Sequence, residues 1–177
     1  ALDHYINAAE RLSSSSLTGL ILGSFYDLVD YKLVPSTTAC DSSLSYGEAP
    51  RSNSPEFSSD GTYKVCARLT DYAGNPAAYG ASASITLKTA LPSFSSLNLA
   101  GDAADTYVNL AERSSSAALV TGLVGLHYNT DRYALVPAAT TCDGSLTYDS
   151  APLANSTDFG SDGSYKVCAQ LTDLAGN

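Results

Sequence analysis

Hydrophobic and polar residues alternate along one stretch in the first half of the chain. After the turn-forming pair Asp60-Gly61, apolar residues occupy every second position of 63–69, and polar residues or cysteine lie between them. A period of two predicts a half-buried antiparallel strand, with Tyr63 on the core face and Cys66 on the opposite face. The other elements can be placed relative to this strand.

The same stretch returns at 162–177 as part of a long internal repeat. Cys40 and Cys142 are 102 residues apart, as are Cys66 and Cys168, and more than half of positions 3–75 recur at that offset. A repeat of this length is a domain-sized unit, not a solenoid turn. We therefore expect two tandem domains, with repeat 1 at 1–91, repeat 2 at 103–177, and between them a linker at 92–102 that is also a candidate first strand of repeat 2.

Shorter apolar or alternating runs predict the remaining strands. In the first copy these runs lie at 17–22, 26–34, 44–46 and 76–87. Roughly seven short strands per copy, separated by turn residues, indicate an all-β chain of two immunoglobulin-like β-sandwiches. The second copy, as given, stops at Asn177 before any counterpart of 76–87 and so lacks its last strand. Either further chain completes this open edge, or another molecule pairs with it by self-association.

The four cysteines occur as one pair in each copy. Even counts at a repeated spacing predict the disulfides Cys40–Cys66 and Cys142–Cys168, and with them an oxidising, extracellular or cell-surface location. A metal site is the alternative, but the sequence has no C-x-x-C motif and neither histidine recurs. Because Tyr63 and Cys66 are three residues apart, they lie on opposite strand faces. With Tyr63 in the core, the sulfur is expected to point outward and to hold the Cys40 loop outside a sheet.

Composition and charge narrow the possible partners. The chain lacks Met and Trp and has a formal net charge of −9 at pH 7. Nucleic acids and anionic membranes require basic patches, so we expect neither nucleic-acid binding nor membrane insertion. With no signal-like segment and no initiator Met, the chain is interpreted as an internal, processed or recombinant fragment. No Gly-x-Ser-x-Gly motif, Gly-rich phosphate loop or recurring histidine beside a nucleophile is present, so we expect no enzyme.

Two motifs that both copies share carry a resemblance to a known family. The endings at 70–75 and 172–177 read Thr-Asp-x-Ala-Gly-Asn, and the openings at 3–10 and 105–112 read Asp-x-Tyr-Ile/Val-Asn-x-Ala-Glu. They resemble the bacterial Ig-like tandem repeats of large surface adhesins and other secreted multidomain proteins. The resemblance covers both copies and implies neighbouring repeats of the same protein as partners. Paired cysteines are not a general feature of that family.

The openings and endings also contain candidate metal ligands. In Ig-like sandwiches the loop before the last strand lies at the same end as the domain's N-terminus, which would gather oxygen ligands suited to calcium at the inter-domain joint. The resemblance implies the same, because many adhesin repeats bind calcium there. The alternative is that Asp and Asn only cap turns and that Glu10-Arg11 is a surface ion pair. The candidate ligands are Asp3, Asn7, Glu10, Asp71, Asn75, Asp105, Asn109, Glu112, Asp173 and Asn177.

Three functions are compatible with these predictions. The first is a structural or adhesive module, part of a bacterial surface or secreted fibre, stiffened by calcium. The second is a module that binds a glycan or a surface protein through a loop cluster, the unpaired edge, or recurring tyrosines such as Tyr26, Tyr31 and Tyr46. The third is an accessory domain of a secreted hydrolase.

Overall fold

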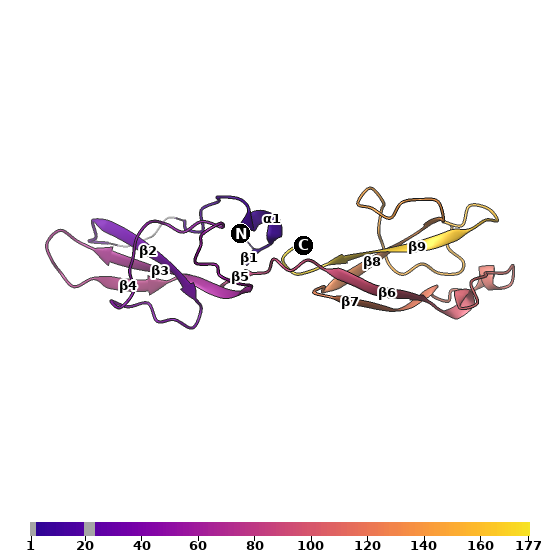
Figure 1. Cartoon of the computed structure of the whole chain (residues 1–177), viewed down its shortest axis with the longest axis horizontal. Helices are drawn as coiled ribbons and strands as arrows, with labels where there is room; N and C mark the ends of the chain where they lie inside the picture. Colours follow the sequence, from indigo (N-terminus) through magenta and orange to yellow (C-terminus); the bar gives the residue numbers. More distant parts are fainter. Residues whose placement is uncertain (1–2, 20–23) are drawn as a thin grey trace. The chain divides into compact units, whose positions relative to one another are not determined.

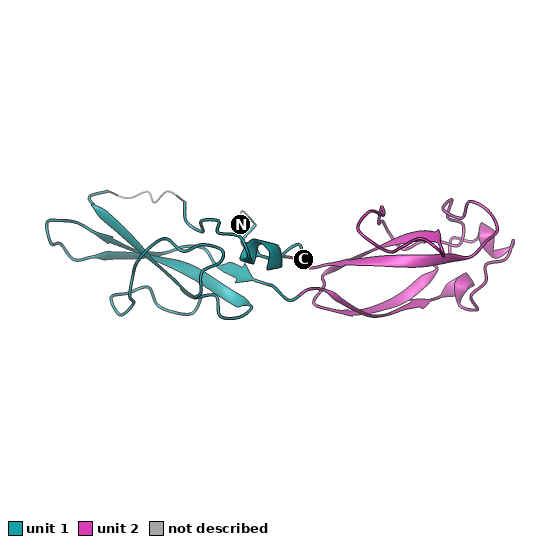
Figure 2. Cartoon of the chain, turned by 45° about the horizontal axis from the view of Figure 1, so that its top comes forward, with its two compact units in different colours: residues 1–90, 175–177 teal, residues 91–174 magenta. Residues whose placement is uncertain are grey.

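The computed structural model describes residues 3–19 and 24–177 and consists mainly of β-strands. Strands hold 37% of the residues and helices 6%, so the chain is all-β. It divides into unit 1, Ala1–Ala90 with Ala175–Asn177, and unit 2, Leu91–Leu174 (Figure 2). Each unit contains one disulfide.

The strands that the structure describes in unit 1 form one mixed sheet. Its elements are β1 (Tyr5–Ile6), α1 (Ala8–Arg11), β2 (Leu28–Pro35), β3 (Gly61–Thr70), β4 (Ala78–Ala81) and β5 (Ile85–Leu87). The strand order is β1-β5-β3-β2, and β4 also pairs with β3 (Figure 1). The β1–β5 pair is parallel and the other pairs are antiparallel. Strand β3 is therefore the centre of the sheet.

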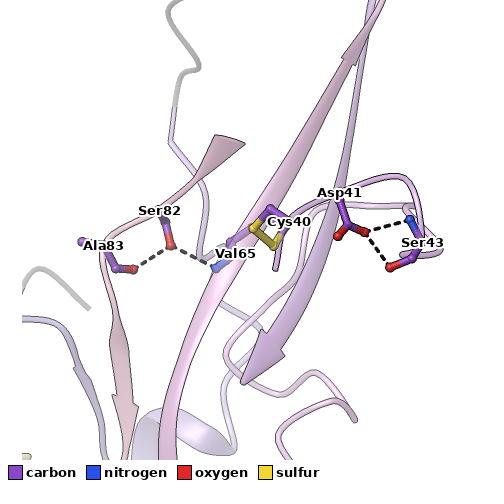
Figure 3. The surroundings of a disulfide bond; sticks show 7 residues. Cys40, Asp41, Ser43, Val65, Ser82 and Ala83 are labelled. Atoms are coloured by element: carbon purple, nitrogen blue, oxygen red, sulfur yellow. Dashed lines mark hydrogen bonds between the residues drawn. A yellow bond between two sulfur atoms is a disulfide. The ribbon is translucent and has the colours of Figure 1, made fainter. Parts of the chain in front are cut away.

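Strand β3 has a buried face and pairs along both edges. The Asp60-Gly61 turn leads into it, and the alternation buries Tyr63 and Val65, each 4% exposed. One edge pairs with β2, and the other is shared by β4 and β5. Ser82 lies between these two short strands, where its Oγ accepts a hydrogen bond from Val65 N at 3.0 Å and donates to Ala83 O at 2.6 Å (Figure 3).

The core of unit 1 gathers around Tyr63. The rings of Phe57 and Tyr63 meet edge to face with centroids 4.8 Å apart. The Tyr63 hydroxyl donates to Ser59 O at 2.8 Å, so the start of β3 is tied to the loop that precedes it. The buried members of this core are Ile6, Leu33, Phe57, Tyr63, Val65, Ile85 and Leu87.

Unit 2 contains two antiparallel strand pairs. Its elements are β6 (Ser93–Leu99), η1 (Gly101–Ala103), η2 (Glu112–Ser114), β7 (Val120–Leu126), β8 (Thr130–Pro137) and β9 (Tyr165–Thr172). Strand β6, which falls within the segment 92–102, pairs with β7, and β8 pairs with β9. The buried members of the core are Ala103, Leu119, Leu135 and Ala154, against which Val108, Phe159, Tyr165 and Val167 pack.

The predicted number of strands is wrong. The sequence predicts roughly seven per copy, whereas the described residues hold β1–β5 in unit 1 and β6–β9 in unit 2. The expected edge strand at 44–46 is replaced by turns and a single bridge between Tyr31 and Gly47. This Ser-rich segment follows Cys40 and turns before a ladder forms.

Two other strand predictions are changed in detail. Of the strand expected at 17–22, residues 20–22 lie outside the described residues; the counterpart in the second copy, 119–124, lies largely in β7. The alternating run at 76–87 forms two strands, not one, because Ser82 interrupts the ladder. Its first part is exposed, and only Ile85 and Leu87 are buried.

Candidate functional site

The disulfide of each unit joins a loop cysteine to a strand, β3 in unit 1 and β9 in unit 2. Cys40–Cys66 and Cys142–Cys168 each have a sequence separation of 26, with Cα atoms 5.4 and 5.5 Å apart. Figure 3 shows the disulfide of Cys40. The pairing predicted from the repeated spacing is confirmed, and all four cysteines are used.

Cys66 lies on the predicted strand face but is more buried than an outward-facing residue would be. Cys66 is not a member of the core cluster around Tyr63, as expected for the opposite strand face. It is nevertheless 0% exposed, and Cys168 is 2% exposed. Cys40 is only half-buried and Cys142 is exposed, so each disulfide is buried at its strand cysteine and reaches the surface at its loop cysteine.

A short turn next to the disulfide has the same geometry in both copies. Asp41 Oδ1 accepts hydrogen bonds from Ser43 N at 2.9 Å and from Ser43 Oγ at 2.6 Å (Figure 3). Asp143 and Ser145 repeat these bonds at 2.9 and 2.6 Å. In each case the serine hydroxyl, and then the backbone N–H, lower the pKa of the aspartate.

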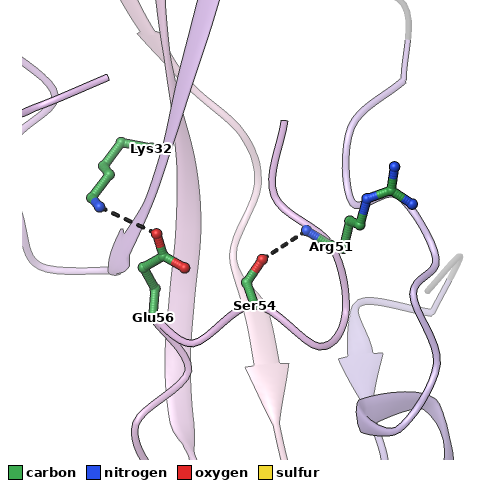
Figure 4. A network of polar contacts seen from close by, with 4 residues as sticks. All are labelled: Lys32, Arg51, Ser54 and Glu56. Carbon is green, nitrogen blue, oxygen red and sulfur yellow. Dashed lines mark hydrogen bonds and ion pairs between the residues drawn. The ribbon is translucent and has the colours of Figure 1, made fainter. Parts of the chain in front are cut away.

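Unit 1 carries a polar hollow of about 610 Å³ between β2 and the loop segment 45–56. Within it, Lys32 Nζ and Glu56 Oε1 are 3.2 Å apart, and Ser54 Oγ accepts a hydrogen bond from Arg51 N at 2.8 Å (Figure 4). Aromatic side chains beside a few fixed polar groups are typical of small-ligand sites. The side chains lining the hollow include Tyr31, Lys32, Tyr46, Glu48, Arg51 and Asn53.

Tyr46 connects this hollow to a charged cluster. The Arg68 guanidinium carbon lies 5.3 Å from the centroid of the Tyr46 ring, and the Tyr79 centroid lies 5.7 Å from it. Arg68 Nη2 donates to Asp30 Oδ2 at 2.6 Å, which raises the pKa of Arg68, while burial raises the pKa of Tyr46. Around neutral pH the cluster is therefore a cation held against a neutral aromatic surface.

The second copy keeps the tyrosines of the hollow, but of its charged positions only that of Glu56 stays charged, as Asp158. Tyr133 and Tyr148 correspond to Tyr31 and Tyr46. Burial, together with a hydrogen bond from the Tyr133 hydroxyl to Asp131 Oδ2 at 2.6 Å, raises the pKa of Tyr133 to about 12. The charged residues Lys32, Glu48, Arg51 and Arg68 are replaced by Ala134, Ser150, Leu153 and Gln170.

In the first copy, the side chains predicted as calcium ligands serve as local caps. Asn7 Oδ1 accepts from Glu10 N at 2.8 Å, and Glu10 Oε2 accepts from Asn7 N at 3.1 Å, which is a capping box at the start of α1. Asp3 Oδ1 accepts from the backbone N–H two residues later at 3.1 Å. Asp71 accepts from Asn75 N at 3.0 Å and from its side-chain amide at 2.5 Å, and these bonds lower the pKa of Asp71.

In the second copy the same capping pattern recurs. Asn109 Oδ1 accepts from Glu112 N at 3.1 Å, and Glu112 Oε2 accepts from Asn109 N at 2.7 Å. Asp105 Oδ1 accepts from the backbone N–H two residues later at 3.0 Å. Asp173 is 6% exposed. The oxygens therefore have hydrogen-bonding roles independent of any metal.

Asn177 has its contacts within unit 1. Its Oδ1 accepts from Ala8 N at 2.8 Å, and its Nδ2 donates to Lys88 O at 2.6 Å. These bonds differ from the expected grouping of Asn177 with Asn109. Across residues 3–19 and 24–177, no three His, Cys, Asp or Glu side chains are grouped to share a metal ion.

Arg11 and Arg113 have a structural role that the sequence reasoning missed. Arg11, interpreted as a surface partner of its neighbouring glutamate, instead lies over the Phe57 ring, 5.7 Å from its centroid. Arg113 lies 4.8 Å from the Phe159 centroid and donates to two backbone carbonyls at 2.8 and 3.0 Å. The sequence did contain a sign of this contact, because the arginine and the phenylalanine both recur 102 residues later.

Together these features define an all-β protein of two disulfide-containing units. The two disulfides are typical of a non-reducing environment such as the cell exterior. Among the helices of the described segments, none has both the length and the apolar character to span a membrane. Comparisons with protein-family models, with curated protein sequences and with solved structures find no match.

Proposed function

We propose that the chain is a structural or adhesive module of an extracellular protein, built from tandem immunoglobulin-like repeats. The strand pairs β6–β7 and β8–β9 suit a two-sheet unit, and the Tyr63–Ser59 hydrogen bond has the form of a tyrosine corner. Neighbouring repeats of the same protein are the natural partners of such a module.

This proposal is supported by the contacts that the two copies share. Both keep the disulfide, the arginine over phenylalanine, the edge-to-face Phe–Tyr pair and the tyrosine hydroxyl bond. Most charges of the hollow are not kept, since only the acid at Glu56 recurs, as Asp158. Repetition of the scaffold without repetition of a polar site favours a role that depends on fold and stability.

Force spectroscopy on the oxidised chain tests a load-bearing role. We expect two discrete unfolding peaks, because each copy has its own core and its own disulfide. Reduction should lengthen each unfolding step by about 9 nm, since 26 residues per disulfide are released at roughly 3.6 Å each. Smooth extension without peaks would contradict the structural role.

Calcium remains part of the proposal as a stiffening ion for the Asn- and Glu-containing turns. A ligand that binds only the folded state at 100 times its Kd raises the free energy of unfolding by about 2.7 kcal/mol. We expect a higher Tm in calcium than in chelator, and a smaller difference in Glu112→Gln, which keeps an acceptor for Asn109 N. Equal Tm values in both buffers would exclude calcium.

The second candidate function is glycan or protein binding, and the hollow of unit 1 favours it. Tyr31 and Tyr46 supply aromatic surface beside charged groups that only the first copy has. On a glycan array we expect saturable binding that Tyr46→Ala abolishes and that Arg51→Leu, the residue type at the corresponding position of the second copy, weakens. Binding that survives both substitutions would place the ligand elsewhere.

A further inference from the structure

We propose that unit 2 binds, along the free edge of β9, an extended segment with the sequence pattern of residues 78–90. In unit 1 this closing segment forms β4 and β5 and continues through Thr89 to Ala90. Among the described residues, β9 pairs with β8 and with no other strand, whereas its counterpart β3 pairs with three. Strand binding at this edge does not depend on whether the chain is a structural module or a binding module.

In unit 1, β3 holds the closing segment along most of its length. Strand β5 pairs with the start of β3 through Tyr63 and Ile85, and β4 pairs with its later part from Cys66 onward. In the gap, Val65 donates its N–H to Ser82 Oγ at 3.0 Å, and Val65 O accepts from Ser82 N at 2.8 Å. A strand edge presents such donors and acceptors in regular succession.

The end of the closing segment is fixed by a second set of contacts. The N–H groups of Thr86 and Lys88 donate at 2.8 and 2.9 Å to carbonyls of His4 and of β1. The carboxylate of Asp60 accepts from Thr89 N at 2.9 Å and from Thr89 Oγ1 at 2.6 Å. These bonds fix the register of the segment.

Unit 2 repeats the receiving side of this arrangement. Residues 162–172 match 60–70 at every position except Ser164 for Thr62 and Gln170 for Arg68. Tyr165 makes the same hydroxyl bond, to Ser161 O at 2.9 Å, so the start of the strand is held in the same way. The counterpart of Asp60 is the exposed Asp162.

Burial shows what the closing segment contributes. Tyr63 is 4% exposed, whereas Tyr165 is only half-buried, although both belong to the cores of their units. In unit 1, Ile85 and Leu87 of the closing segment are 8% and 3% exposed and belong to the same core as Tyr63. Adding such a segment to unit 2 would remove the exposed apolar surface around Tyr165 from water.

The occupant that fits is the closing segment of a repeat of the same kind. It combines aliphatic side chains two residues apart, at Ile85 and Leu87, with Ser82 to bridge the gap and Thr89 to bond the aspartate. A generic strand would satisfy the backbone of β9 but not Asp162 or the core. Specificity therefore lies in the side chains, as in other cases of strand addition.

A fluorescent peptide of residues 76–90, titrated against the intact oxidised chain, tests this. We expect saturable one-to-one binding and new hydrogen-exchange protection of amides in 163–171. A control peptide with Ile85→Asn and Leu87→Asn should not bind. Equal binding of the two peptides, protection confined to unit 1, or no new protection in β9 would each overturn the proposal.

Matched variants distinguish side-chain recognition from non-specific peptide binding. Asp162→Asn should weaken peptide binding about fivefold, the effect of one lost hydrogen bond, while Asp60→Asn in unit 1 should leave it unchanged. A chain with residues 76–90 appended after Asn177 should fold the segment onto β9 and lose peptide binding. Unchanged binding by that chain, or equal losses in the two aspartate variants, would refute the proposed edge.

Discussion

Replacing both cysteines of one unit by alanine removes a cross-link without leaving a reactive thiol. The separation between the paired cysteines is 26 residues in each unit. In the chain-entropy model, a loop of this length raises the free energy of unfolding by about 3.5 kcal/mol. Because the loops are equal in length, this contribution is equal in the two units.

Packing adds a smaller contribution. Cys66 and Cys168 are 0% and 2% exposed, so alanine leaves a small void under the loop that costs about 1 kcal/mol. The expected total is about 4–5 kcal/mol per unit. Small domains are stable by only about 5–15 kcal/mol, so the altered unit should be left marginally folded.

Hydrogen-exchange mass spectrometry along a urea series measures this loss separately for each unit. Peptides from β3 report the Cys40→Ala/Cys66→Ala variant, and peptides from β9 report the corresponding variant of unit 2. The untouched unit is the internal control. A loss below about 1 kcal/mol in either unit, or losses that differ more than about twofold, would show that restriction of the unfolded chain is not the main effect.

Two further perturbations probe unit 2. Gly125→Ala should lower the free energy of unfolding by about 1–3 kcal/mol, because the new Cβ would lie 2.7 Å from Ser93 O. Gly144→Ala is the control, since a Cβ there would have no neighbouring heavy atom within 4 Å. Equal urea midpoints for the two variants would contradict the reasoning. The pKa of Tyr133 is raised from 10.0 to about 12, so its contribution to stability is present below pH 10 and is lost as the pH rises through about 12. Burial, the largest cause, is kept in Asp131→Asn, so the substitution should shift this titration only part of the way toward 10 in an ultraviolet pH titration; an unchanged curve would contradict the contribution of Asp131.

Strands β3 and β9 and the disulfides could be predicted because their signals are local and occur twice. The alternation around Tyr63 needs only neighbouring residues, and the cysteine spacing is fixed by the repeat. The Cys66 environment could not be predicted in the same way. Alternation identifies the face of a strand, but only the folded loop determines whether that face is covered.

Pairing between distant segments was not predictable from local pattern. Strand β1 has two residues and pairs in parallel with β5, about eighty positions later, and nothing in its sequence specifies that partner. Backbone conformation could not be predicted from the sequence either: His4 and Thr106, at corresponding positions, have φ of 65° and 72°. Non-glycine residues seldom adopt this region, and a β-branched threonine is strongly disfavoured there, so the surrounding fold must impose it on Thr106.

The two copies show how much a partner strand determines local structure. Tyr5–Ile6 is a strand in unit 1, where β5 supplies its hydrogen bonds, and Ile6 is 0% exposed. The equivalent segment at 107–108 is not a strand, and Tyr107 is 75% exposed. The sequences are nearly the same, so the difference follows from whether a closing strand lies beside the segment. A strand bound to β9 should therefore convert 107–108 to the extended form and bury Val108 as Ile6 is buried.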